Sequence, residues 1–168
     1  MRIILGIDPG SVVTGYGVIQ AEGNHYQFLD CGAIKTQGDN FATRLFQIYH
    51  QLIEVLQRYK PHEVSIEDIF FHNNAKSALK LGQARGAAIV AVASQGLMVS
   101  EYSAREVKQA VVGYGAAGKD QVQHMVKRLL NLKQTLQSDA ADALAIAICH
   151  GQNRLLNNVY KELLKETS

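Results

Sequence analysis

Two acidic side chains stand where predicted strands end. The apolar runs Arg2–Asp8 and Val64–Glu67 predict short buried strands, and Asp8 and Glu67 are their last residues. In open α/β sheets, ligands bind at the carboxyl ends of the strands. Both carboxylates are therefore expected to face a site rather than bulk solvent.

A second acidic pair lies in the segment S-D-A-A-D near the C-terminus. Ser138 is a helix-capping residue type, so a helix is predicted over Asp139–His150. Asp139 then lies in the first turn and Asp142 lies one turn later on the same face. The small alanines between the two acids allow another backbone, or a substrate, to come close.

Carboxylates gathered at one point repel one another unless cations neutralise them. Their oxygens suit hard divalent cations, and Mg²⁺ typically takes one or two carboxylates together with waters and phosphate oxygens. Two such ions about 4 Å apart can activate a water and stabilise the leaving oxygen of an in-line phosphoryl displacement. Each acid taken alone could instead cap a turn, stabilise a helix end or lie in solvent. The spacing leaves both interpretations open.

The elements that must position these acids can be predicted from hydrophobic periodicity and capping signals. Strands are predicted over 2–8, 13–20, 25–36, 64–67 and 97–101. Helices are predicted over 41–59, 74–95, 103–112, 120–132 and 139–150, and an apolar pattern over 155–164 predicts a separate final helix. The order βββαβαβααα predicts an α/β domain whose mixed sheet is covered by helices.

Length and composition limit the class of protein. The 168 residues predict one domain over 1–168, with about 153–168 as a C-terminal helix or tail. A hydrophobic fraction of 47% and a charged fraction of 19% exclude a disordered chain. No apolar run approaches the roughly 20 residues of a membrane span. Two distant cysteines, Cys31 and Cys149, and a start without a signal peptide predict a cytoplasmic protein.

The net charge of +2 is unevenly distributed along the chain. Residues 76–133 hold nine basic and three acidic side chains, whereas the flanking segments are both acidic. A modest total therefore conceals a basic region, which is the electrostatic feature that nucleic-acid binding requires. That region includes Lys80, Arg85, Lys108 and Lys119.

Long blocks of the chain resemble the RuvC family of bacterial Holliday junction resolvases. The blocks run in order from residue 3 to about residue 150. They are I-I-L-G-I-D-P-G-S at 3–11, T-G-Y-G at 14–17, I-E at 66–67, S-A-L-K-L-G-Q-A-R-G at 77–86, V-K-Q at 107–109, Q-V-Q-H-M-V at 121–126 and D-A-A-D-A-L-A at 139–145.

This resemblance implies an α/β, RNase H-like fold with a mixed five-stranded β-sheet flanked by α-helices. It implies a homodimer that cuts four-way junction DNA in recombination and repair, with two Mg²⁺ ions per active site and Mn²⁺ as a possible substitute. Paired symmetric nicks would leave 5′-phosphate and 3′-hydroxyl ends. A branch-migration complex of RuvA and RuvB type is the implied protein partner. The family's catalytic, metal-binding acids fall on Asp8, Glu67, Asp139 and Asp142.

The resemblance also implies residues that contact DNA. The family's DNA-facing lysines match Lys108 and Lys119, and its junction-wedging aromatic matches Phe70. The adjacent Phe71 could stack on a base in place of Phe70, a contact worth about 1–3 kcal/mol. Lys80 and Arg85 are further DNA-binding candidates in the basic segment.

Other interpretations compete with a nuclease. The chain could bind junctions without cutting them. It could also be a nucleotide-binding module, since Asp8-Pro9-Gly10 with Gly15 and Gly17 is similar to the phosphate loop of actin-like ATPases, although the chain has room for only one such domain. The P-loop-like segment from Gly113 to Lys119 lacks the hydroxyl residue that should follow the lysine.

Two glycines in the predicted helix over 74–95 allow two structural interpretations. Gly82 and Gly86 could allow close packing on the sheet, or they could belong to a face that contacts a second copy of the chain.

Overall fold

The computed structural model describes residues 1–69 and 74–166. Its strands are β1 (Arg2–Asp8), β2 (Val13–Glu22), β3 (His25–Lys35), β4 (Glu63–Glu67) and β5 (Val99–Tyr102). Its helices are α1 (Phe41–Tyr59), α2 (Ala75–Ser94), α3 (Ala104–Val112), α4 (Lys119–Leu129) and α5 (Ser138–Glu166). This order is the one predicted from the sequence.

The five strands form one mixed sheet in the order β3-β2-β1-β4-β5. β1, β2 and β3 are antiparallel neighbours, whereas β4 runs parallel to both β1 and β5. In the parallel pair, Ile7 lies opposite Ile66. Asp8 and Glu67 are the next residues of these two strands, so both acids come to the same edge of the sheet. The predicted α/β fold with a mixed five-stranded sheet is confirmed.

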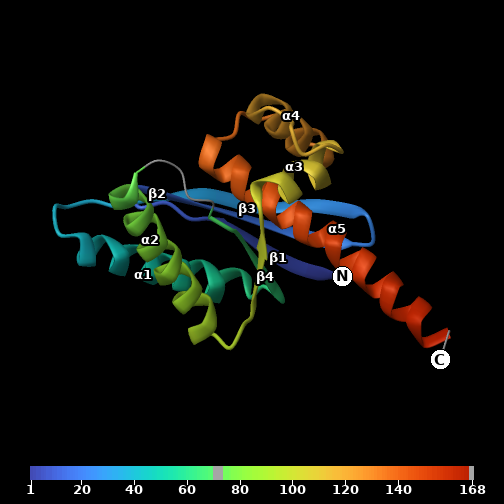
Figure 1. Ribbon diagram of the computed structural model, residues 1–168, viewed down its shortest axis with the longest axis horizontal. Coiled ribbons are helices and arrows are strands. Elements are labelled where there is room, and N and C mark those ends of the chain that lie inside the picture. Colours follow the sequence, from blue (N-terminus) through green and yellow to red (C-terminus); the bar gives the residue numbers. More distant parts are fainter. Residues whose placement is uncertain (70–73, 167–168) are drawn as a thin grey trace.

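Helices cover both faces of the sheet, and each face has its own apolar core (Figure 1). α1 and α2 pack on one face over side chains such as Leu5, Val18 and Ile66. α3, α4 and α5 pack on the other face over Ile4 and Ile19. The central strands β1 and β4 are thus buried on both sides, which holds in place the edge of the sheet that carries Asp8 and Glu67.

α5 lies against β1 and β2 at backbone contact. A Cβ atom placed on Gly15 would stand 2.1 Å from the carbonyl oxygen of Asp139, and one placed on Gly6 would stand 2.1 Å from that of Ala143. Neither distance is possible for real atoms, so these two positions must be glycine for the helix to lie where it does. The buried alanines of α5, such as Ala140 and Ala143, complete this close approach.

The structure corrects two predictions about α5. The predicted final helix is not separate, because α5 continues without a break from Ser138 to Glu166. Gly151 does not end it: a Cβ atom there would lie 2.7 Å from the ring of Tyr26, so this glycine serves packing. Ser138 lies inside the helix rather than before it, since the carbonyl of Gln137 accepts the amide of Ala141.

The structure also contradicts close packing of Gly82 and Gly86 on the sheet. No described atom lies within 4 Å of a Cβ atom built at either glycine. Both belong to a stripe along the outer face of α2, flanked by Leu79 and Val90, which are 67% and 59% exposed. Among the described residues, no helix is long and apolar enough to cross a membrane.

Candidate active site

The four predicted acids come together at the edge where β1 and β4 end. Asp8 and Glu67 end these adjacent parallel strands, and the first turns of α5 bring Asp139 and Asp142 to the same place. The contact between Gly15 and the backbone of Asp139 sets this approach. Strand register and helix packing, rather than long side chains, therefore position the acids.

The electrostatics of Asp8 show how closely the acids influence one another. Burial, followed by the negative charges of Glu67, Asp142 and Asp139, raises the pKa of Asp8 from 3.8 to about 8, and the charge of Lys119 only partly opposes this. Burial and the charge of Asp142 likewise raise the pKa of Glu67. The site therefore favours protons or other positive charge over bare carboxylates.

Two lysines supply the nearest positive charge. Lys119, the first residue of α4, places its Nζ 3.0 Å from Oδ2 of Asp142, and this contact raises the pKa of the lysine. Lys108 of α3 is half-buried, and its charge partly opposes the rise in the pKa of Glu67. Both lysines predicted to contact DNA thus lie beside the acids.

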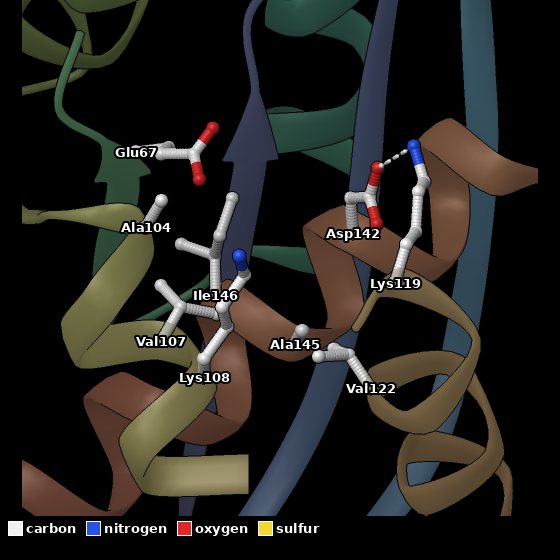
Figure 2. Close-up of a pocket in the computed structure, with 9 residues that line it drawn as sticks. All are labelled: Glu67, Ala104, Val107, Lys108, Lys119, Val122, Asp142, Ala145 and Ile146. Atoms are coloured by element: carbon white, nitrogen blue, oxygen red, sulfur yellow. Dashed lines mark ion pairs between the residues drawn. The ribbon is translucent and has the colours of Figure 1, made fainter. Parts of the chain in front are cut away.

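A pocket of about 200 Å³ opens next to these side chains (Figure 2). Figure 2 shows Glu67 on one side of the pocket and the Lys119–Asp142 ion pair on the other, with Lys108 projecting between them. Apolar side chains of α3, α4 and α5, including Val107, form its floor. The carboxylates of this pocket would repel a phosphate group. Bound cations, in addition to the two lysines, would offset that repulsion.

The donor set fits a hard divalent cation. Its four ligand candidates are all carboxylates, the donor type that Mg²⁺ and Mn²⁺ prefer, and a bound cation would relieve the repulsion that raises the pKa of Asp8. Within residues 1–69 and 74–166, no three His, Cys, Asp or Glu side chains lie close enough together to hold a metal ion.

The other predicted DNA-binding residues lie in different settings. Lys80 is exposed on α2, and its Nζ lies 5.6 Å from the centre of the Phe41 ring. The Arg85 side chain is only 15% exposed and forms ion pairs with Glu101 and Asp68. Phe70, and with it the alternative Phe71, lies outside the described residues.

Sequence reasoning missed a glutamine that holds the glycine-rich connector before α4. The side-chain oxygen of Gln121 accepts hydrogen bonds from the backbone amide of Gly118 and from the Tyr114 hydroxyl, both at 2.8 Å. These bonds fix the start of α4 and hence Lys119. The signal was present in the sequence, because a glutamine three residues after a helix N-cap is half of a capping box.

A hydrogen-bonded loop also supports the residues after Asp8. The Thr14 hydroxyl donates to the Gly10 carbonyl and accepts from the Gly10 amide, at 2.9 and 3.2 Å. From α1, Arg44 donates to the Ser11 carbonyl and to the Thr36 hydroxyl. No local pattern reveals the role of Arg44, because its partners lie 33 and 8 residues away in the chain.

The structure gives no support to the nucleotide-binding interpretations. In an actin-like phosphate loop Gly15 and Gly17 would face phosphate, but here they face the backbone of Asp139 and Leu144. Lys119 points to Asp142 rather than into a loop of backbone amides. The P-loop-like segment, residues 113–119, follows helix α3, whereas a true P-loop follows a strand.

Comparisons with solved structures define the class of protein. The RuvC of T. thermophilus in complex with a Holliday junction substrate superposes with a TM-score of 0.88 at 35% identity, covering 94% of this chain and 97% of that one. A yeast mitochondrial Holliday junction resolvase shares the fold at a TM-score of 0.70 and 13% identity, covering 98% of this chain and 84% of that one. The fold is therefore the RNase H-like fold of the Holliday junction resolvases, as predicted.

Sequence comparison identifies the family within that class. The sequence model of the family "Crossover junction endodeoxyribonuclease RuvC" matches residues 4–150. Crossover junction endodeoxyribonucleases RuvC of Legionella pneumophila and Geobacter sulfurreducens are 58% and 55% identical, over 92% and 95% of this chain and 89% and 98% of theirs. The chain belongs to the RuvC family, and the resemblance predicted from the sequence is confirmed.

Proposed function

We propose that this protein resolves Holliday junctions through a carboxylate site made of Asp8, Glu67, Asp139 and Asp142. As a member of its family, the chain is a crossover junction endodeoxyribonuclease. One observation carries the assignment of the site: parallel β1 and β4 end side by side beneath the first turn of α5. Four acids on three rigid elements provide the constellation that metal-dependent phosphodiester hydrolysis needs.

The four acids are the groups that would hold two Mg²⁺ ions, with Mn²⁺ as a substitute. When bound, such ions activate a water and stabilise the departing oxygen, which leaves a 5′-phosphate and a 3′-hydroxyl. The protein's own part is positioning. Asp8 and Glu67 are held by strand register, and Asp139 and Asp142 are held by the contact of α5 with the sheet.

Lys119 and Lys108 are positioned to bind phosphate beside the acids. Lys119 pairs with Asp142 at 3.0 Å. A cation bound by Asp142 would release the ammonium group of Lys119, which could then contact a phosphate oxygen. An ammonium group fixed at the site where negative charge develops stabilises the transition state. Lys108, which projects into the same pocket between Glu67 and Lys119, can contact a neighbouring phosphate of the same strand.

The outer face of α2 supports a homodimer. Leu79, Gly82, Gly86 and Val90 recur at intervals of three or four residues and form an exposed stripe of small and apolar residues along the helix. Small and apolar residues at this spacing allow two helices to approach closely. Two copies related by a two-fold axis would present two equivalent sites, which suits symmetric nicks in a junction that is itself nearly symmetric.

The protein's cellular setting follows from the same proposal. A resolvase of bacterial chromosomal junctions works in the cytoplasm, where a branch-migration complex of RuvA and RuvB type is the expected partner. The thiols of Cys31 and Cys149 are both free, which suits a reducing compartment.

Magnesium-dependent nicking of a labelled four-way junction, with linear duplex of the same sequence as control, tests the proposal. The wild-type protein should cut the junction at paired positions, and Asp8→Asn should lower the rate at least about a thousandfold, because several kcal/mol of charge stabilisation are lost. Junction binding in EDTA should change little. Normal cutting by Asp8→Asn would refute the site, and binding without any cutting by the wild type would favour a non-catalytic junction binder.

A further inference from the structure

Arg85 joins three elements at the point where β4 ends. Its Nε donates to the backbone carbonyl of Glu67 at 3.2 Å. Its Nη2 lies 2.5 Å from Oε2 of Glu101 on β5 and 3.8 Å from Oδ1 of Asp68. The side chain of Arg85 therefore contacts the main chain of Glu67, the carboxylate of the next residue, Asp68, and the carboxylate of Glu101 on the adjacent strand.

We propose that Arg85 is a positioning residue that fixes Glu67 for metal binding, and that it does not bind DNA directly. The inference rests on the proposed role of Glu67. Mg²⁺ demands near-ideal octahedral geometry, so groups that orient a carboxylate ligand raise the affinity of the site. Arg85 holds the peptide of Glu67 through its carbonyl oxygen.

The sheet itself gives Glu67 little support beyond this point. Glu67 is the last residue of β4 and pairs with Tyr102, the last residue of β5. The amide of Asp68 makes one more bond, 2.7 Å to the Tyr102 carbonyl. Arg85 supplies the lateral contact that the end of the ladder lacks, and Glu101 in turn orients the guanidinium group.

The charge balance around Arg85 argues against a direct contact with DNA. Two carboxylates, those of Glu101 and Asp68, already lie near its guanidinium group, and the side chain is only 15% exposed. A phosphate would have to displace an acid that is already in place, at the cost of a charge-assisted hydrogen bond. Lys108 and Lys119, by contrast, line an open pocket.

The location of Arg85 on α2 gives the contact a second consequence. The next residue is Gly86, which belongs to the exposed apolar stripe of the same helix. A shift of α2 when that stripe is covered would pass through Arg85 to the Glu67 backbone. The helix proposed to meet the second copy is thus tied directly to the metal site.

Magnesium titration of the single-turnover cleavage rate tests the inference on the full-length protein. Arg85→Ala should raise the half-saturating Mg²⁺ concentration at least fivefold, whereas junction affinity in EDTA and its dependence on salt should stay at the wild-type value. Arg85→Lys should bring the half-saturating Mg²⁺ concentration only part of the way back to the wild-type value. An ammonium group at that position cannot reach the Glu67 carbonyl and Glu101 in the same planar arrangement. Arg58→Ala, in the last turn of α1, removes an equal charge and should behave like the wild type.

Glu101→Gln distinguishes the two possible roles of Arg85, because each role predicts a change in a different quantity. If Arg85 positions Glu67, loss of its anchor should raise the half-saturating Mg²⁺ concentration about twofold or more. If Arg85 binds DNA, freeing it from Glu101 should tighten junction binding and steepen the salt dependence instead. The inference is overturned by that second result, or by an Arg85→Ala variant that loses junction affinity while keeping the wild-type Mg²⁺ response.

Glu67→Gln in the same titration distinguishes failure of the inference from failure of the proposed function. If Glu67→Gln cuts with the wild-type Mg²⁺ response, the assignment of Glu67 itself is wrong. If Glu67→Gln is inactive while Arg85→Ala keeps the wild-type response, only the positioning role fails. Thermal unfolding in EDTA confirms that each variant is folded, and Glu101→Gln keeps the test decisive if Arg85→Ala does not fold.

Discussion

The carboxylate of Asp8 is buried and has more negative than positive charge near it, and both conditions disfavour its ionised form. Burial is the largest cause of its raised pKa of about 8, and the acids Glu67, Asp142 and Asp139 add to it. If Asp8 binds a divalent cation as proposed, that cation would have to displace the proton that Asp8 holds near neutral pH. Cation affinity should therefore rise with pH, as for any site whose ligand must first lose a proton.

The same shift predicts how the metal-free protein responds to pH. The folded state holds the Asp8 proton up to about pH 8, whereas the unfolded chain releases it near 3.8, so stability falls as pH rises between these values. Asp8→Asn removes the effect and should stabilise the protein in EDTA at pH 8 by about 2–4 kcal/mol, with little change at pH 4. Urea denaturation at both pH values measures the difference, and equal effects at the two would contradict the raised pKa.

At the scale of elements, the acids depend on how closely α5 approaches the sheet. The contact is between backbones, since Gly6 and Gly15 present no side chain to the helix. Strand pairing fixes the position of Asp8 and Glu67, and this contact fixes the position of the other two acids relative to them. Loss of either constraint should disturb the site before it unfolds the domain.

Gly15→Ala tests this dependence. The added methyl group would meet the Asp139 carbonyl at 2.1 Å, so the first turn of α5 must shift. We expect a loss of about 1–3 kcal/mol of stability and a much larger proportional loss of cleavage at fixed Mg²⁺. Gly82→Ala is the matched control for the stability measurement alone, because Gly82 lies on the proposed dimer face: no described atom obstructs its methyl group, and exchange of a helical glycine should stabilise the monomer by up to about 1 kcal/mol. Equal effects of the two substitutions would contradict the proposed geometry.

Prediction from sequence succeeded for elements and failed for contacts between distant residues. The ten elements and the strand-end acids follow from local periodicity, capping residues and charges at strand ends, all of which lie within a few residues of one another. The continuity of α5 was missed because the pattern predicts two helices, over 139–150 and 155–164, whereas Gly151 between them packs on the ring of Tyr26, 125 positions earlier. The ion pair of Arg85 with Glu101 was missed for the same reason, because only the folded sheet brings α2 beside β5.

For the whole molecule, the outer face of α2 is an exposed surface of small and apolar residues. Leu79 and Val90 are two of the large apolar side chains that the described chain leaves exposed to solvent. α2 packs on α1 and the sheet with its other face, through residues such as Ala84, Ala88 and Val92. A surface of this kind, on the same helix as Arg85, is where pairing of two copies would be expected to influence both active sites.

Val90→Asp should convert the protein from dimer to monomer at micromolar concentration, because a charge buried in an apolar interface without a partner is costly. Sedimentation velocity measures the change. On a plasmid cruciform the monomer should release nicked circles in place of linear product, since the two cuts are no longer made together. Leu156→Asp, which changes an apolar residue of α5 that is also exposed, should leave both results as in the wild type. A dimer that survives Val90→Asp would exclude this face.

The backbone contact between α5 and the sheet also determines how stiff the active site is. A site framed by long side chains can widen or narrow by rotation about χ angles, but glycine and carbonyl atoms in contact have no such freedom. Any ion held between the sheet acids and the helix acids must then be accommodated by the carboxylate torsions alone. Preferred oxygen distances differ between cations, from about 2.0–2.1 Å for Mg²⁺ to about 2.3–2.6 Å for Ca²⁺. In the proposed metal site, discrimination by ionic radius would then depend on the main chain, through the two glycines that set the contact between α5 and the sheet.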